Sequence, residues 1–422
     1  MADLGRAIGL CSVIVAILAT GICAMTTLFD EESFSPYIAT ALLPSSSLVA
    51  AVRQRVLDEA GRWFPELAKS DLRVRIGEGL VRPRCYVHRI ELDDGRLRRA
   101  VLLKVRHSVA AHRRLDRYPG ERPVLSPERT IPDDEAALLE FDGLRQISLF
   151  ARSDDRFGVV RGLTCLPEHA AVVMDLVDQP TLLARMLATS RTRPHHTARV
   201  PAVPVQVWAN LGAWLRSFHD RLDSPTLPAH IGSRDEVGAL YPQYAEFLGR
   251  RLRSSAFPRF LERSTRQSAT WLESALPLAV GHGDFVASNV FVGDRGMVTG
   301  FDPLPCWRVA RYKDLATLVI GMRIHPVQAA SLGWAFDRSA LAAYEQALHR
   351  GYFAGAEVPT TALEAFQLLV LLDRWADLVS KTARSGRVKS GLRAARVELA
   401  NHYYETEARR TLRALQTART VT

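Results

Sequence analysis

The sequence predicts an α+β fold with two lobes, in which a strand-rich N-terminal lobe precedes a mainly helical C-terminal lobe. Three short runs in the first part of the chain are expected to be strands, at Leu72–Ile76, Cys85–Leu92 and Arg99–Val105. They are the length of strands and are bounded by Gly, Pro and Asp. From residue 205 onward the chain is expected to be mainly helical, because its apolar residues recur at helical spacing.

The elements of the N-terminal lobe are expected in a definite order. A helix that runs toward Trp63 comes first, and the Asp93-Asp94-Gly95 turn then joins two strands as a hairpin. The polar, Arg-rich segment His107–Asp133 is expected to be a surface loop. A helix at Asp134–Phe150 follows. Two more strands are expected, at Val159–Leu163 and Ala171–Leu176.

The first 45 residues form a separate region. Ile8–Phe29 is a run of 22 residues without a charge, which is long enough to cross a bilayer as a helix. It is longer than the apolar core of a typical signal peptide, and no convincing cleavage site follows it. We therefore expect a membrane helix, with a signal peptide, a buried helix or a misassigned start as alternatives. The expected domains are an anchoring segment with its linker at 1–45, a nucleotide-binding lobe at 46–178 and a catalytic and substrate lobe at 179–422.

Composition indicates an ordinary globular protein with a basic surface. Apolar residues make up 47% of the chain and charged residues 24%. The net charge of +10 favours anionic partners such as nucleotides, phospholipid headgroups or phosphorylated molecules. No motif for binding RNA or DNA accompanies this charge, so no nucleic-acid partner is expected. The five cysteines form no CxxC pair and no zinc-binding spacing, which indicates a reducing compartment.

The strongest chemical signal is the segment GHGDFVASNVFV at 281–292. Asp284 is followed five residues later by Asn289, and Asp302 follows in the sequence Gly-Phe-Asp-Pro. Phosphoryl transfer needs a carboxylate near the attacking hydroxyl and oxygen ligands for Mg²⁺. Asp284 is therefore the candidate that orients the hydroxyl and accepts its proton, and Asn289 and Asp302 are the candidate metal ligands. A plain polar turn is the alternative for a lone HGD, but three such groups in this order favour the catalytic interpretation.

This segment resembles the catalytic loop of the aminoglycoside phosphotransferase/choline kinase family, which shares the protein-kinase-like fold. His282, Asp284, Asn289 and Asp302 match the family's HGD, Asn and Asp positions one by one. The resemblance extends over about residues 70–380. It implies an enzyme that uses ATP and Mg²⁺ to phosphorylate a hydroxyl of a non-protein substrate.

Two further motifs agree with this resemblance. Asp314-Leu315-Ala316 resembles the family's later Asp-Leu-Ala, whose Asp is expected to brace the catalytic loop from a helix start. The segment 211–219 resembles the helix that packs before the catalytic loop. Since its apolar residues share one helical face, His219 at its end is expected to be structural.

The N-terminal lobe contributes the predicted nucleotide contacts. Lys104 lies within an apolar strand, and a buried lysine is costly unless it is paired or binds a ligand. In the resembling family this lysine contacts the ATP phosphates and pairs with a helix glutamate. Glu135 and Glu140 compete for that role. Glu140 is preferred because the sequence after it looks more like the family's Glu-aromatic-x-x-Leu helix. The alternative for Lys104 is an edge-strand lysine that snorkels to the surface.

Two weaker signals complete the predicted nucleotide site. Gly77 and Gly79 lie between two predicted strands, where their backbone N–H groups could lie over the phosphates, although a plain hairpin turn explains them nearly as well. The segment that begins at Val172 looks like the hinge between the lobes. Backbone groups of Asp175 and Val177 are then expected to bind adenine; a core strand that ends in a turn is compatible with that role.

Two rival functions are open at this stage. A protein kinase is disfavoured because HGD stands where protein kinases have His-Arg-Asp, and only 11 residues separate Asp302 from Asp314. A membrane-anchored nucleotide-binding module without catalysis, similar to a pseudokinase, is disfavoured because every expected chemical group is present. Small molecules, sugars and lipid-linked molecules are all candidate acceptors. Their pocket is expected in helices after Trp307, including 344–352 and 368–378.

Charges around the apolar run conflict with the location that an ATP-dependent enzyme requires. Arg6 precedes the run and three acidic residues, 30–32, follow it. The positive-inside rule would therefore place the lobes outside the cell. Because ATP is abundant in the cytosol and a single Arg is a weak signal, the lobes are expected to be cytoplasmic.

Overall fold

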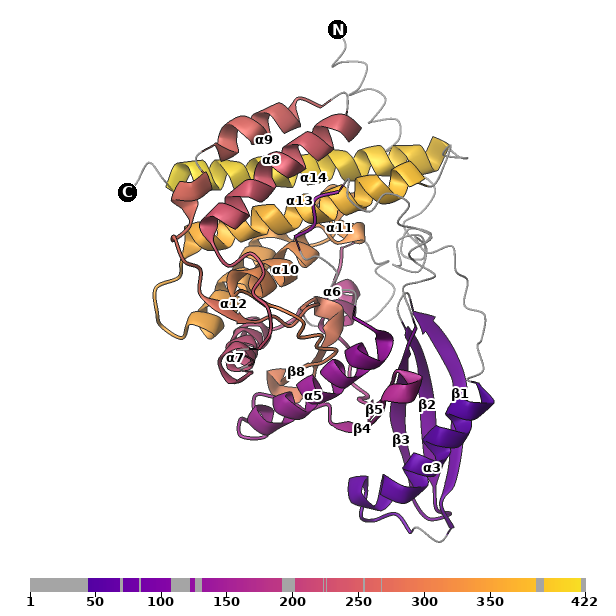
Figure 1. Cartoon of the computed structure of the whole chain (residues 1–422). Coiled ribbons are helices and arrows are strands. Elements are labelled where there is room, and N and C mark those ends of the chain that lie inside the picture. Colours follow the sequence, from indigo (N-terminus) through magenta and orange to yellow (C-terminus); the bar gives the residue numbers. More distant parts are fainter. Residues whose placement is uncertain are drawn as a thin grey trace.

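A five-stranded antiparallel sheet forms the N-terminal lobe of the computed structural model (Figure 1). Its strand order is β1-β2-β3-β5-β4. The strands are β1 (Arg73–Arg82), β2 (Cys85–Asp93), β3 (Arg98–Arg106), β4 (Gly162–Leu166) and β5 (Ala171–Asp175). The structure describes residues 45–68, 71–82, 85–107, 122–125, 131–191, 202–222, 224, 226–252, 255–266, 268–384 and 391–418.

Alternation along β3 gives the sheet two different faces. Val101 and Leu103 are buried with the apolar side of α3 (Ser46–Trp63) in one cluster. Leu102 and Lys104 project to the opposite face, because successive side chains of a strand point to opposite sides. On that face lies α5 (Asp133–Ala151), and Leu102 packs in a second cluster with apolar residues of that helix. The same alternation that builds the core thus turns Lys104 toward α5.

Helices dominate the C-terminal lobe, with four short strands near its junction with the sheet (Figure 1). The helices are α6 (Leu182–Ala188), α7 (Val205–Arg221), α8 (Arg234–Arg251), α9 (Phe257–Thr265), α10 (Tyr312–Arg323), α11 (Pro326–Ala330), α12 (Arg338–Phe353), α13 (Thr360–Arg384) and α14 (Gly391–Ala418). Two antiparallel pairs, β6 (Leu278–Val280) with β9 (Arg308–Ala310) and β7 (Val290–Val292) with β8 (Val298–Gly300), frame the predicted catalytic segments. The predicted α+β arrangement of a small antiparallel sheet and a helical lobe is confirmed.

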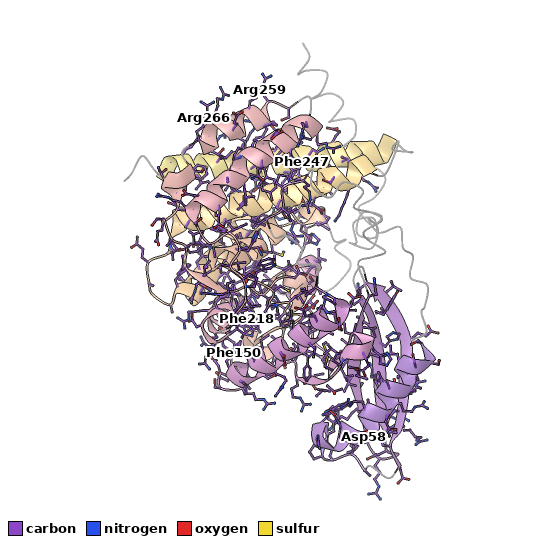
Figure 2. All side chains as sticks on the ribbon, viewed as in Figure 1. Asp58, Phe150, Phe218, Phe247, Arg259 and Arg266 are labelled. Carbon is purple, nitrogen blue, oxygen red and sulfur yellow. The ribbon has the colours of Figure 1, made fainter. Side chains whose placement is uncertain are left out.

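Aromatic side chains join α5 to the helical lobe. Phe150 of α5 and Phe218 of α7 both contact Trp214, with ring centroids 5.9 and 5.6 Å away. Figure 2 shows these two phenylalanines inside the molecule, whereas Arg259 and Arg266 point outward at the far end of the helical lobe. Because aromatic pairs bury large areas in specific geometries, α5 is held to both lobes at once.

Three sequence-based expectations change in the structure. The strand predicted at 159–163 lies slightly later, as β4 at 162–166. The segment predicted as a surface loop contains Leu125, which is only 4% exposed and packs in the core of the helical lobe. The predicted membrane helix at 8–29 lies outside the described residues. Within the described ranges, no helix is long and apolar enough to cross a membrane.

Two glycines allow α7 and α12 to touch backbone to backbone. A Cβ on Gly351 of α12 would lie 1.9 Å from the Ala209 carbonyl oxygen of α7. A Cβ on Gly212 of α7 would lie 2.0 Å from the Leu348 carbonyl oxygen of α12. Because backbone atoms cannot rotate away as a side chain can, only glycine fits at both crossing points.

We predict that Gly351→Ala destabilises the fold by about 1–3 kcal/mol, because the added methyl forces the two helices apart. Gly321→Ala in α10 is the matched control, since a Cβ at that position would have no atom within 4 Å. Alanine there should be neutral or stabilise by up to about 1 kcal/mol through helix propensity. Urea unfolding of both variants checks this, and equal shifts in the two midpoints would contradict the close packing.

Candidate active site

The predicted catalytic loop, 281–289, is held by an aromatic cage and a tight turn. His282 is fully buried, and its ring lies 5.3 Å from Phe218, 5.3 Å from Phe285 and 6.0 Å from Trp214. Burial lowers the pKa of His282 to about 4, so this ring is neutral at pH 7. Gly283 has φ +90°, and a Cβ there would lie 2.5 Å from the Leu304 carbonyl oxygen. Glycine is therefore required directly before Asp284.

Asp314 fastens this loop to the helical lobe. Its Oδ2 accepts a hydrogen bond from the His282 N–H at 2.8 Å and contacts His219 Nε2 at 3.1 Å. His219 Nδ1 in turn lies 2.7 Å from the Tyr352 hydroxyl. Burial alone would raise the pKa of Asp314, but the hydrogen bond and charge of His219 lower it to about 2. The carboxylate therefore stays ionised, and His219 lies in the bracing network, where a structural residue was expected.

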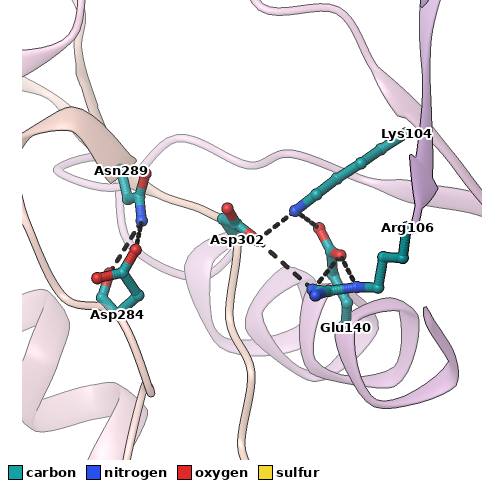
Figure 3. Close-up of polar contacts among 6 residues, drawn as sticks. All are labelled: Lys104, Arg106, Glu140, Asp284, Asn289 and Asp302. Atoms are coloured by element: carbon teal, nitrogen blue, oxygen red, sulfur yellow. Dashed lines mark hydrogen bonds and ion pairs between the residues drawn. The ribbon is translucent and has the colours of Figure 1, made fainter. Parts of the chain in front are cut away.

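Asp284 and Asn289 contact each other within the catalytic loop (Figure 3). The Asn289 Nδ2 donates to the Asp284 backbone oxygen at 3.0 Å and to its Oδ2 at 3.1 Å. Asp284 is exposed, whereas Asn289 is only 9% exposed. Since the amide nitrogen is used in this way, the amide oxygen of Asn289 points away from Asp284 (Figure 3).

The β7–β8 hairpin brings Asp302 to the same place as Asn289. Val290 pairs with Gly300, and the Phe301 N–H donates to the Asn289 carbonyl oxygen at 3.1 Å. Asn289 and Asp302 therefore lie at one end of the hairpin, although 13 positions separate them in the sequence. Asp302 has φ +59°, a left-handed conformation that Asp tolerates better than most residues.

Lys104, Glu140 and Asp302 form one cluster between the lobes (Figure 3). Lys104 Nζ donates to Glu140 Oε1 at 2.9 Å and also to the Asp302 carboxylate. Burial disfavours the charged lysine, but Asp302 and Glu140 outweigh it and raise the pKa of Lys104. Burial would likewise raise the pKa of Asp302, but Lys104 lowers it to about 2. The structure thus pairs Lys104 with Glu140 rather than with Glu135, which lies in the first turn of α5.

Arg106 also belongs to this cluster, although the sequence motifs did not indicate it as a site residue. Its Nε and one terminal nitrogen donate to Glu140 Oε2 at 3.1 and 2.6 Å. That terminal nitrogen also lies 3.8 Å from Asp302 Oδ1. Strand alternation could have found it, because Arg106 follows Lys104 by two positions and so shares its face of β3.

Gly77 and Gly79 do not form the turn that was predicted between two strands. They lie inside β1, at an irregularity in its pairing with β2, and the connection between β1 and β2 comes after Arg82. A Cβ on Gly79 would lie 2.4 Å from the ring of His88, which is 2% exposed. His88 Nδ1 also lies 3.2 Å from the Gly77 carbonyl oxygen. These glycines therefore make room for a buried histidine, and the alternative of a plain hairpin turn is wrong, whereas the contact of their backbone N–H groups with phosphates stays a prediction.

The predicted hinge residues lie at the end of β5 and just after it. Asp175 ends β5, and its N–H already donates to the Arg161 carbonyl oxygen at 3.0 Å. The Arg161 side chain holds the Asp175 carboxylate at 2.8 and 2.9 Å. Adenine recognition at this position would therefore use the Asp175 carbonyl rather than its N–H. Val177 lies just beyond, partly buried against the apolar cluster under α5.

The donor set suits Mg²⁺ bound together with a nucleotide. Mg²⁺ is usually held by one or two protein oxygens, with the remaining positions filled by phosphates and water. Asn289 and Asp302 supply an amide and a carboxylate oxygen at one hairpin end. Among the described residues, no group of three or more His, Cys, Asp or Glu side chains could hold a metal by itself. The site therefore fits a metal that arrives with phosphate and not a closed protein cage.

The segment at 122–125, which precedes α5 in the sequence, packs against the helical lobe through Leu125. Asp373 Oδ1 of α13 accepts from the Leu125 N–H at 3.2 Å and from the Tyr244 hydroxyl at 2.8 Å. His230 Nε2 lies 3.0 Å from the Leu125 carbonyl oxygen, and its ring is 5.4 Å from Trp307. This chain of contacts leads back to the catalytic loop, because the Gly281 N–H donates to the Trp307 carbonyl oxygen at 3.0 Å.

The predicted acceptor helices separate into two kinds. Tyr344 stacks on Trp208 at 5.0 Å and Tyr352 contacts His219, so this part of α12 is buried against α7. The range 368–378 instead contains Asp373, whose side chain is 21% exposed beside Leu125. Tyr344 and Tyr352 are therefore committed to packing, while the acceptor role expected for the range 344–352 stays a prediction.

Comparison with known proteins finds a family similar to part of the chain. The sequence model of the phosphotransferase enzyme family matches residues 167–358. Over these residues the chain is similar to that family. The match includes Asp284, Asn289, Asp302 and Asp314, and it confirms the prediction of a phosphotransferase enzyme. No curated protein matches the sequence.

Solved structures of phosphotransferases are also similar to this chain, at low identity. Spectinomycin phosphotransferase, in complex with ADP and spectinomycin, is 14% identical, covers 88% of this chain and 100% of its own, and has a TM-score of 0.43. Choline kinase from Cryptosporidium parvum is 11% identical, with 88% and 97% covered and a TM-score of 0.48. A macrolide 2′-phosphotransferase from Brachybacterium faecium is 14% identical, with 83% and 97% covered and a TM-score of 0.45. Similarity at this level does not identify an acceptor.

We predict that Gly79→Ala destabilises the phosphotransferase by about 1–3 kcal/mol, because its methyl would displace the His88 ring. Gly77→Ala is the control, since its Cβ would lie 3.4 Å from the nearest atom, the Arg89 carbonyl oxygen, and should cost less. Thermal unfolding and calorimetry with Mg-ADP check the pair. A Gly79→Ala variant of normal stability but weakened nucleotide binding would contradict the packing role and support the predicted nucleotide contact of this glycine.

Proposed function

We propose that this phosphotransferase transfers the γ-phosphate of ATP, as its Mg²⁺ complex, to a hydroxyl group of a small-molecule, sugar or lipid-linked acceptor. The observation that carries the proposal is that Asp284, Asn289 and Asp302 of the helical lobe lie together opposite Lys104 of the N-terminal lobe (Figure 3). Phosphoryl transfer requires positioning and charge stabilisation more than covalent chemistry, and these groups supply both.

Each residue has a distinct task in this reaction. Asp284 is exposed at the loop mouth, where it orients the acceptor hydroxyl and accepts its proton. Asn289 and Asp302 would hold Mg²⁺, which supplies charge neutralisation at the phosphates when it is bound. Lys104, supported by Glu140, orients the phosphates from the N-terminal lobe.

The ionisation states support these tasks at neutral pH. The pKa of Asp302 is lowered to about 2 by Lys104, so its carboxylate is available as a metal ligand across the physiological range. Lys104 now contacts the Asp302 carboxylate. Binding of Mg²⁺ and phosphate would therefore require Lys104 to exchange this carboxylate for a phosphate oxygen.

The rival functions are less well supported. A protein kinase needs a long segment after its metal-binding Asp to dock a peptide. Here the Leu304 N–H donates to the His282 carbonyl oxygen, and β9 pairs with β6, so the short connection is already committed to the fold. A non-catalytic nucleotide-binding module would not need Asp284 braced through Asp314.

The acceptor class is proposed from the surroundings of Asp284. Trp307, His230 and Asp373 extend from the catalytic loop toward the docked segment at Leu125. An aromatic ring with an acidic group nearby suits a polar, hydroxyl-bearing molecule that also carries apolar or cationic surface. Soluble amino alcohols, sugars and antibiotics fit this description, as does the headgroup of a lipid-linked glycan.

We predict that Asp284→Asn lowers turnover at least about 100-fold, because the amide cannot accept the hydroxyl proton. The isosteric amide keeps an oxygen for Asn289, so calorimetry should show Mg-ADP binding nearly unchanged. The assay follows ATP consumption with a panel of amino alcohols, sugars, aminoglycosides and lipid-linked glycans. Asp302→Asn is the matched comparison and should lose the Mg²⁺-dependent part of nucleotide binding. Near wild-type turnover by Asp284→Asn would show that the catalytic loop is assigned incorrectly.

We also propose that the apolar run at 8–29 anchors the enzyme to a membrane with its lobes in the cytoplasm. Its length supports this, since 22 helical residues span about 33 Å at roughly 1.5 Å per residue. The catalytic groups all lie in the folded lobes that begin at Ser45. The Ser45 hydroxyl accepts from the Leu48 N–H at 3.3 Å and caps α3.

We predict that deletion of residues 1–44, which keeps the Ser45 cap, releases the enzyme into the soluble fraction with its ATP chemistry intact. Fractionation of cells that express the full chain and the deletion variant checks this. A full chain that is already soluble would disprove the anchor. Digestion of the lobes by protease added outside intact cells would disprove the cytoplasmic placement and favour the orientation indicated by Arg6.

A further inference from the structure

Two cations, Lys104 and Arg106, contact two carboxylates between the lobes (Figure 3). The two carboxylates, of Glu140 and Asp302, differ in burial and in the number of their contacts. Glu140 is 1% exposed and uses both of its oxygens, with Oε1 on Lys104 and Oε2 on Arg106. Asp302 lies at the open edge of the cluster, with 31% of its side chain exposed. Lys104 therefore stands between a buried carboxylate and an accessible one.

Charge balance explains why one lysine is not enough here. A buried carboxylate that loses its partner costs several kcal/mol, so Glu140 requires a permanent cation. Lys104 cannot serve this carboxylate alone if it must also face Asp302 and, in the proposed reaction, the phosphates. Arg106 meets the requirement, because it donates to Glu140 Oε2 at 3.1 and 2.6 Å and its side chain is only 11% exposed.

The geometry points to Arg106 as a positioning residue for phosphoryl transfer, acting through Glu140. Its guanidinium keeps Glu140 neutralised and oriented while Lys104 exchanges Asp302 for the nucleotide phosphates. This inference rests on the proposed function, since it concerns how the nucleotide site rearranges. Arginine suits the task because its charge is permanent and its planar guanidinium directs two N–H donors at one oxygen, Glu140 Oε2.

The orientation of Arg106 argues against direct contact with phosphate. Its Nε and a terminal nitrogen both face Glu140, and that terminal nitrogen lies farther from Asp302, at 3.8 Å. A group that bound the nucleotide directly would instead turn its fork toward the cleft. Arg106 and Glu140 should therefore behave as one unit, and removal of either should largely remove the effect of the other.

A double-mutant cycle of Arg106→Gln and Glu140→Gln tests this. Arg106→Gln should weaken Mg-ADP binding, measured by calorimetry, and lower kcat/KM at least about tenfold, since a charge-assisted pair is lost. In the Glu140→Gln background the same change should have little further effect on either quantity. Arg106→Lys, which keeps the charge without the fork, should recover part of the loss.

Arg99→Gln is the matched control, because Arg99 lies on the same strand and pairs with Glu66 at the surface, with 45% of its side chain exposed. It should stay within about twofold of the wild type in kcat/KM, as expected for a surface ion pair. Thermal unfolding of each variant shows whether it is folded, and Arg106→Lys carries the test if Arg106→Gln unfolds.

The outcomes separate this inference from the proposed function. If Arg106→Gln and Arg106→Lys both match Arg99→Gln, or if the effects of Arg106→Gln and Glu140→Gln simply multiply, Arg106 is not a positioning residue, whatever the enzyme phosphorylates. If the wild type transfers no phosphate to any acceptor but the binding cycle still shows coupling, the proposed reaction fails, and Arg106 then positions Glu140 for nucleotide binding alone.

Discussion

The ion pair between Lys104 and Asp302 links the N-terminal lobe to the helical lobe. One partner comes from a strand of the N-terminal sheet and the other from the end of the β7–β8 hairpin in the helical lobe. Lys104 is shielded from water, whereas 31% of the Asp302 side chain is exposed, and a buried charge is stable only when further hydrogen bonds satisfy it. Glu140 and Arg106 complete the ion pair, so that the orientation of α5, the register of β3 and the end of the hairpin are linked through one cluster.

The catalytic side of the cleft has a different physical basis. Asp284 is exposed, but the loop that carries it is anchored by a fully buried ring at His282 and by the Asp314 carboxylate. A rigid support below an accessible carboxylate is what general-base catalysis requires, because small displacements of the reacting groups are costly. The network through His219 and Tyr352 extends this support to α7 and α12, which pack so closely that glycine occurs at both crossing points.

The proposed acceptor side contains a contact between distant parts of the chain. Leu125 lies between β3 and α5 in sequence, yet it packs in the helical lobe and binds Asp373 of α13. A segment that follows the N-terminal sheet strands therefore packs into the helical lobe. Under the proposed function, changes in this short segment would alter substrate selection without altering the cluster around Lys104.

Local patterns in the sequence determined the element types, the catalytic loop and the Lys104 strand, because these follow from alternation, spacing and the chemical needs of phosphoryl transfer. Tertiary structure alone decided between Glu135 and Glu140, since that choice depends on how α5 rotates against the sheet. Tertiary structure also placed Gly79 against His88 of the neighbouring strand, a contact that no local sequence motif predicts. It likewise buried Tyr344 of α12 against Trp208 of α7. Strand alternation predicts that Arg106 lies on the same face of β3 as Lys104. Its ion pair with Glu140, however, depends on the position of α5 in the tertiary structure.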